Sequence, residues 1–171
     1  MERTTSNGDH FQHTIKSEIT ISGAGIHTGQ SVTMRLKAAD PNTGIVFRRV
    51  DLKDKPYIKA DVDNVIETNR STTLESNGGR VSTIEHLLAS LVGMQVDNVL
   101  IEIDGEEVPI LDGSAEPFVA ALEKTGTLKQ DARKIYYSIE HNITFVDEEK
   151  KVEMVALPYL EYRINTLIDF N

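Results

Sequence analysis

Glu85 and His86 are neighbours at the start of an apolar repeat, in the stretch STIEHLLASLVG (82–93). A carboxylate and an imidazole can act as general acid and base, and an imidazole also binds zinc. Adjacent residues of a helix point about 100° apart, so both side chains can flank one cleft. Ser82 and Glu85 also have the spacing of a capping box, in which the carboxylate bonds the Ser82 amide. From spacing alone, the capping box is the favoured interpretation.

A catalytic zinc needs three protein ligands, and the sequence offers few candidates. The metalloprotease spacing H-E-x-x-H is absent, and Ser82 stands where H-x-x-E-H would need a histidine. The chain has no cysteine, His10 and His13 lie near its start, and His141 has no acidic residue four positions later. The residues themselves therefore provide one plausible ligand, His86.

Two glycine-containing turns could approach a substrate closely. GAGIHTG (23–29) superficially suggests a phosphate loop, but a strand follows it where such a loop requires a helix. A hairpin turn with His27 exposed at its tip is therefore favoured. LDGSAEP (111–117) is likewise first of all a tight turn and a helix cap at Ser114.

The elements that position these residues follow from the hydrophobic pattern. Period-two alternation over 14–21 and 31–38 predicts a hairpin, and 44–52 and 62–82 supply further extended segments. Apolar residues at helical spacing in 82–93 predict a stripe that faces a sheet: Ile84, Leu87, Leu88, Leu91 and Val92. A buried strand (97–104), a short edge strand (106–113) and a second helix (115–126) follow.

The chain divides into three parts by this reading. Residues 1–12 are expected to be a flexible lead-in, and 13–132 a complete α/β domain. After the polar stretch 127–133, three consecutive strands (134–147, 150–159 and 162–170) predict the incomplete start of a second domain. A three-stranded sheet with one bare apolar face is marginal by itself.

The amino-acid composition argues against several classes of function for this protein. Eighteen Lys and Arg against 27 Asp and Glu give a net charge of −9, which disfavours nucleic acid as a partner. The absence of cysteine excludes a disulfide framework. The chain contains neither a signal-like segment nor an apolar run long enough to span a membrane, so we expect a soluble, cytoplasmic protein.

Several motifs, in order, resemble the zinc-dependent UDP-3-O-acyl-N-acetylglucosamine deacetylase family of lipid A biosynthesis. They are GAGIHTG, PNTGIVFRRVDL, VSTIEHLLASLVGMQVDNVLIEIDG, VPILDGSAEPF and the terminal TLIDFN. The resemblance implies an α+β fold of two similar domains. Each is a two-layer α/β sandwich, a small mixed sheet with two packed helices, and the active site lies in the cleft between them.

The resemblance also implies roles. His86 would be a zinc ligand and Glu85 the general base that takes a proton from zinc-bound water, a role that now outweighs the capping box. The loops that the family keeps near its substrate, UDP-3-O-acyl-N-acetylglucosamine, contain His27, Thr28, Asn69, Asp112 and Ser114.

The family's other zinc ligands, an H-x-x-x-D pair, and its general-acid histidine belong to the second domain and do not occur here. We therefore expect an amino-terminal portion of the deacetylase that holds one Zn²⁺ ligand and is inactive without the missing second domain. The alternative is a stand-alone, noncatalytic binding domain on the same fold, because a fold does not fix a function.

Overall fold

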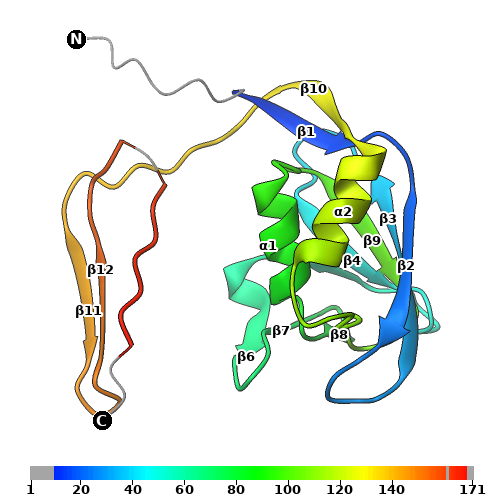
Figure 1. The fold of residues 1–171 in the computed structure, drawn as a ribbon, viewed down its shortest axis with the longest axis horizontal. Coiled ribbons are helices and arrows are strands. Elements are labelled where there is room, and N and C mark those ends of the chain that lie inside the picture. The colour runs from blue at the N-terminus through cyan, green and yellow to red at the C-terminus, as the bar shows by residue number, and fades with distance from the viewer. Residues whose placement is uncertain (1–9, 161, 169–171) are drawn as a thin grey trace. The chain divides into compact units, whose positions relative to one another are not determined.

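The computed structural model describes residues 10–160 and 162–168 (Figure 1). Its internal contacts divide the chain into two compact units. One unit comprises Phe11–Arg133, and the other comprises His10 together with the described residues from Lys134 onward. Two helices and several mixed or antiparallel sheets make up the described chain, which confirms the α+β class.

A five-stranded mixed sheet forms the centre of the first unit. Its strands lie in the order β2 (Ile19–Ala24), β3 (Ser31–Ala38), β9 (Val99–Ile103), β4 (Ile45–Arg49) and β5 (Tyr57–Lys59). Strands β4 and β9 are parallel, and the other neighbours are antiparallel. The predicted hairpin is confirmed as β2 and β3, joined by the glycine turn.

Two helices cover one face of this sheet (Figure 1). Alternate residues of the central strands point to that face and are buried, such as Met34 on β3 and Ile101 on β9. Helices α1 (Glu85–Gly93) and α2 (Glu116–Thr125) contribute the buried side chains Leu87, Leu91, Phe118 and Leu122. The two-layer sandwich is therefore held by a single apolar core.

A small antiparallel sheet precedes α1. A short 3₁₀ helix, η1 (Val62–Asn64), leads into β6 (Val65–Glu67), β7 (Thr73–Ser76) and β8 (Gly79–Val81). Asn77 (φ 54°) and Gly78 (φ 76°) form the turn between β7 and β8, where left-handed backbone suits asparagine and glycine. The predicted extended segments of this region are confirmed as β6, β7 and β8, but Val62–Asn64 is helical rather than extended.

Strand β1 (Phe11–Ile15) pairs with β10 (Thr127–Arg133) and joins the two ends of the first unit. Gln12 is buried, and its side-chain amide donates to the Arg133 carbonyl (2.9 Å) and to Asn42 Oδ1 (2.8 Å). The lead-in expected at 1–12 is thus wrong for Phe11 and Gln12, while residues 1–9 lie outside the described residues. The polar stretch 127–133 is a strand rather than a connection.

Two boundaries near the candidate residues also differ from expectation. Helix α1 begins at Glu85, not Ser82, and Val92 is 65% exposed instead of facing the sheet. The edge strand expected over 106–113 is reduced to one isolated bridge, between Ser82 and Glu107. That bridge nevertheless fixes Glu107 beside the chain that enters α1.

The second unit contains an antiparallel hairpin of β11 (Ile143–Asp147) and β12 (Val152–Ala156). The third expected strand is wrong for residues 162–168, which form no strand, and residues 169–170 lie outside the described part. Both faces of the hairpin carry exposed apolar side chains, including Ile143, Phe145, Met154 and Val155.

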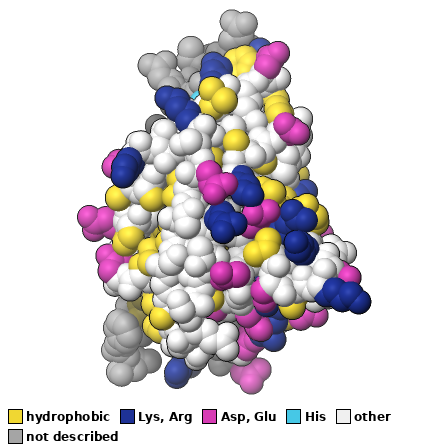
Figure 2. Space-filling model, turned by 90° about the vertical axis from the view of Figure 1, so that its right-hand side faces the viewer, with side chains coloured by type: hydrophobic (Ala, Val, Ile, Leu, Met, Phe, Trp, Pro, Cys, Tyr) yellow, Lys and Arg dark blue, Asp and Glu magenta, His cyan; other side chains and the backbone are white. Residues whose placement is uncertain are grey.

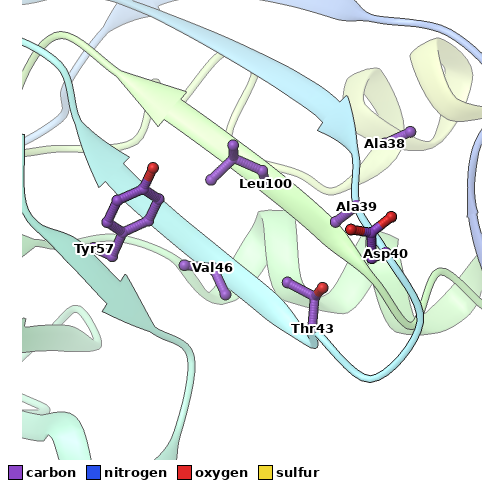
Figure 3. Close-up of a pocket in the computed structure, with 7 residues that line it drawn as sticks. All are labelled: Ala38, Ala39, Asp40, Thr43, Val46, Tyr57 and Leu100. Carbon is purple, nitrogen blue, oxygen red and sulfur yellow. The ribbon is translucent and has the colours of Figure 1, made fainter.

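The large sheet's other face carries charged side chains and a shallow hollow. Lys37 Nζ and Arg48 Nη1 contact the Glu102 carboxylate at 2.7 and 3.3 Å. In the face shown in Figure 2, basic and acidic side chains are likewise interspersed. Figure 3 shows the hollow over the strands, with the helices behind them, so it lies on the side opposite α1 and α2; Val46, Tyr57 and Leu100 line it.

Neither helix of the described chain has the length and apolar character needed to cross a lipid bilayer.

Candidate active site

The first turn of α1 carries both Glu85 and His86, and both side chains are half-buried. Glu85 Oε2 accepts a hydrogen bond from the backbone N–H of Thr72 (3.0 Å). The Ser82 N–H donates instead to the Glu106 carbonyl (2.8 Å). The capping-box interpretation is therefore wrong, because the Ser82 N–H is bonded to the Glu106 carbonyl and the Glu85 carboxylate is bonded to the loop 68–72.

The bond from Thr72 ties the loop 68–72 to α1. Asn69 is exposed in this loop, next to Arg70, whose backbone is left-handed (φ 58°). The structure thus brings the loop that contains Asn69 to the helix turn that contains Glu85 and His86.

Asp112 and Ser114 lie in the tight turn that leads into α2. Asp112 Oδ1 accepts from both the N–H and the hydroxyl of Ser114 (2.9 Å each), and Ser114 Oγ accepts from the Glu116 N–H (3.1 Å). The Ser114 donors hold the pKa of Asp112 below its usual range, and the charge of His86 adds to this effect. The hydrogen bonds of Ser114 thus hold Asp112 within the turn that leads into α2.

The glycine turn between β2 and β3 places His27 and Thr28 at an exposed tip, as expected. Gly25 N–H donates to the Gln30 carbonyl and Gly29 N–H to the Gly25 carbonyl, both at 3.0 Å. Gly29 has φ 66°, a conformation that favours glycine. The backbone N–H groups of His27 and Thr28 point inward, to the carboxylate of Glu107.

Glu107 is the residue that the sequence did not reveal. It is fully buried, and Thr83 donates its hydroxyl to Glu107 Oε1 (3.0 Å). Burial acts to raise the pKa of Glu107, but the donors from His27, Thr28 and Thr83 outweigh it and hold the pKa below its usual value. Nothing in the local pattern separates Glu107 from the exposed Glu106, because only pairing with Ser82 decides which of them faces inward.

Four segments that carry candidate residues thus meet around the start of α1: the glycine turn, the loop 68–72, the 110–114 turn and the helix turn itself. A carboxylate and an imidazole side by side suit water activation and metal binding. Within the described residues, no group of three or more histidine, aspartate or glutamate side chains is arranged to hold a metal ion.

A family model described as UDP-3-O-acyl N-acetylglycosamine deacetylase matches residues 12–171. The chain belongs to this deacetylase family. The match runs through all four segments around α1 and through both strands of the second unit. The resemblance inferred from the five sequence motifs is therefore confirmed at the level of the family.

Curated relatives agree with this membership. UDP-3-O-acyl-N-acetylglucosamine deacetylases of Geobacter sp. (strain M21) and Citrifermentans bemidjiense are each 44% identical over 160 residues, 94% of this chain and 52% of the relative. The bifunctional enzyme LpxC/FabZ of Chlorobaculum tepidum is 43% identical over 159 residues, 93% of this chain and 34% of the relative. The chain spans about half the length of the deacetylases that it matches.

Proposed function

We infer that these residues belong to a zinc-dependent amidohydrolase that removes acetate from UDP-3-O-acyl-N-acetylglucosamine in lipid A biosynthesis. The observation that carries this proposal is the family match over 12–171, which includes Glu85 and His86 together in the first turn of α1. Relatives at 44% identity are named as deacetylases of this substrate.

In this proposal Glu85 is the general base. Its carboxylate takes a proton from the water that attacks the N-acetyl carbonyl carbon. The amide C–N bond then breaks, and acetate and the free amine are the products. The Thr72 N–H bonds Oε2 and fixes the direction of the carboxylate, which leaves a second oxygen with which to accept the proton.

His86 supplies one zinc ligand in this proposal. When held there, zinc would supply Lewis-acid chemistry, which would polarise the substrate carbonyl and make the attacking water more acidic. A catalytic zinc takes three protein ligands, and the described residues bring no such set together. His86, half-buried beside Glu85, fits one ligand position. The proposal assigns the other ligands, and the group that protonates the leaving amine, to a second domain outside these residues.

The hairpin of β11 and β12 supports this assignment. An isolated two-stranded hairpin is marginally stable in water, and this one exposes Phe145 and Met154 by 56% and 62%. Such side chains fit the first strands of a second similar domain that further residues would cover. We therefore expect the 171-residue chain to be inactive when it is tested without those residues.

Loops around the start of α1 are proposed to hold the substrate. Each is connected to the segment that carries Glu85 and His86, by the Thr72 bond, by electrostatic interaction with Asp112, or through Glu107. The polar side chains proposed for this role are His27, Thr28, Asn69, Asp112 and Ser114.

The test measures acetate release and bound zinc in the complete protein that carries these residues. Glu85→Gln is expected to lower kcat by about 100- to 10,000-fold, the usual contribution of a general base. Its zinc content should stay unchanged. His86→Ala is expected to lose both zinc and activity, because an open zinc site with one ligand fewer holds the metal poorly.

Glu123→Gln is the matched control, because Glu123 is an exposed carboxylate on α2. It should leave kcat and zinc content unchanged. A Glu85→Gln variant within about threefold of the wild-type kcat would contradict the role of general base. Acetate release by the purified 171-residue chain would contradict the need for a second domain.

A further inference from the structure

The Glu107 carboxylate is fully buried, and it accepts hydrogen bonds from three residues: His27, Thr28 and Thr83. The N–H groups of His27 and Thr28 donate to it at 3.0 and 2.8 Å, the Thr28 hydroxyl at 2.8 Å and the Thr83 hydroxyl at 3.0 Å. These donors are neutral backbone and hydroxyl groups. A buried charge is tolerated when hydrogen bonds replace its water, and each such charge-assisted bond is stronger than a neutral one.

The glycine turn is shaped around this carboxylate. A Cβ at Gly25 would collide with Glu107 Oε2, so the close approach requires a residue without a side chain. On the other side, Ile110 N–H donates to the Ala24 carbonyl (3.0 Å), and this bond joins the turn to the segment that leads to Asp112.

Thr83 connects Glu107 to the helix turn. It stands two residues before Glu85 and has φ 56°, which is unusual for a β-branched side chain. Such strain persists only where surrounding contacts hold it, and it gathers at functional sites. Here the bond to Glu107 and the backbone bonds of Ser82 with Glu106 and Val108 hold this strained turn in place.

We propose that Glu107 is a positioning residue, whose carboxylate fixes the glycine turn and the entry into α1 relative to each other. It sets the places of His27 and Thr28 against those of Glu85 and His86. This inference rests on the proposed function for its effect on catalysis. The geometry that it describes can be tested without any activity.

The first test measures amide hydrogen exchange in the isotope-labelled chain. Glu107→Gln keeps the size of the side chain but removes the charge and one acceptor. Exchange of the His27 and Thr28 amides should accelerate about tenfold or more, while the Ile101 amide in β9 should not change. Glu106→Gln, the same change at the exposed neighbour, should leave all three rates as they are. Equal rates in the two variants would overturn the inference.

The second test measures kcat and KM in the complete protein. Thr83→Val removes one hydroxyl and leaves the turn's own bonds to Glu107, so it should lower kcat while the His27 and Thr28 amides stay protected. Misplacement of reacting groups by about 1 Å can cost about 100-fold in rate. The kcat of the Glu107→Gln/Thr83→Val double variant should be no lower than that of Glu107→Gln, since both changes break the same connection between Glu107 and Thr83.

Full additivity of the two changes, or a wild-type kcat in Thr83→Val, would overturn the inference. If Glu107→Gln does not fold, Thr83→Val decides by its kcat and its protected amides. If the wild-type protein releases no acetate, the proposed function fails, and amide exchange still decides whether Glu107 positions the turn.

Discussion

Glu107 links the pH to the stability of the first unit. Its folded pKa lies below the ordinary value of 4.5, because donors from His27, Thr28 and Thr83 outweigh burial. A lowered folded pKa contributes stability that is present above the unfolded pKa and is lost as the pH falls through the folded pKa. Protonation would also leave buried donors facing a weaker acceptor.

We therefore expect the free energy of unfolding to decrease as the pH falls below 4.5, and part of this decrease to be absent in Glu107→Gln. Urea unfolding of both proteins from about pH 7 to pH 3 measures the difference. Asp51 and Glu102 also have lowered pKa values. Their contribution to the pH dependence of unfolding is present in both the wild type and the variant, so the difference between the two proteins reports on Glu107. Parallel curves for the two proteins would contradict this prediction.

At the scale of the elements, α1 is held by a narrow apolar stripe. Leu91 is fully buried, whereas Val92 is 65% exposed. Leu91→Ala is expected to lower the free energy of unfolding by about 2–5 kcal/mol, as large-to-small changes in cores do. Val92→Ala should change it by less than about 0.5 kcal/mol, as exposed substitutions do. Urea denaturation of both variants measures this, and similar losses would show that the stripe is wider.

The case of Val92 shows how far periodicity can predict a face. At 100° per residue, Leu91 lies about 20° from the direction of Ile84, but Val92 lies about 80° from it. The pattern therefore identified the buried Ile84, Leu87 and Leu91 and assigned one residue too many. The alternation in β3 was equally predictable, because that strand has one buried and one open face. The apolar run of β9 predicted a buried strand, and its alternate residues Val99, Ile101 and Ile103 are indeed buried.

Strands β10 and β5 could not be predicted in this way. TLKQDAR reads as a polar connection because β10 is paired only with β1 and remains largely exposed. Tyr57–Lys59 is too short to show a period. A strand exists only with a partner, and the local sequence does not say where the partner lies.

The candidate site was predictable in its motifs but not in its connections. Glu85 and His86 were identified by residue type, spacing and resemblance. The Thr72 bond that directs Glu85 and the burial of Glu107 depend on contacts between segments far apart in the sequence. The capping-box interpretation failed for the same reason, since the Ser82 N–H has a long-range partner.

At the scale of the whole molecule, the second compact unit begins directly after Arg133. Tyr137 in this unit is 98% exposed, whereas Tyr57 within β5 is 49% exposed. Because exposed chain outside secondary structure is the preferred site of proteolysis, limited chymotrypsin digestion should cleave first after Arg133, at exposed tyrosines such as Tyr137 and Tyr162.

The fragment that contains 11–133 should keep a cooperative thermal transition, since its core lies entirely within those residues. Mass spectrometry and circular dichroism of the digest measure both expectations. Initial cleavage at Tyr57, or a fragment without a transition, would contradict the division into units.

The pairing of Phe11 with Arg133 gives the first unit adjacent ends. The chain enters this unit through β1 and leaves it through β10, and these two strands are paired neighbours. Units of this kind are suited to insertion into a host protein and to circular permutation, because a short peptide can bridge their ends. The first unit could therefore be circularly permuted. A short linker would join Arg133 to Phe11, and the new termini would lie in the exposed turn of Asn77 and Gly78.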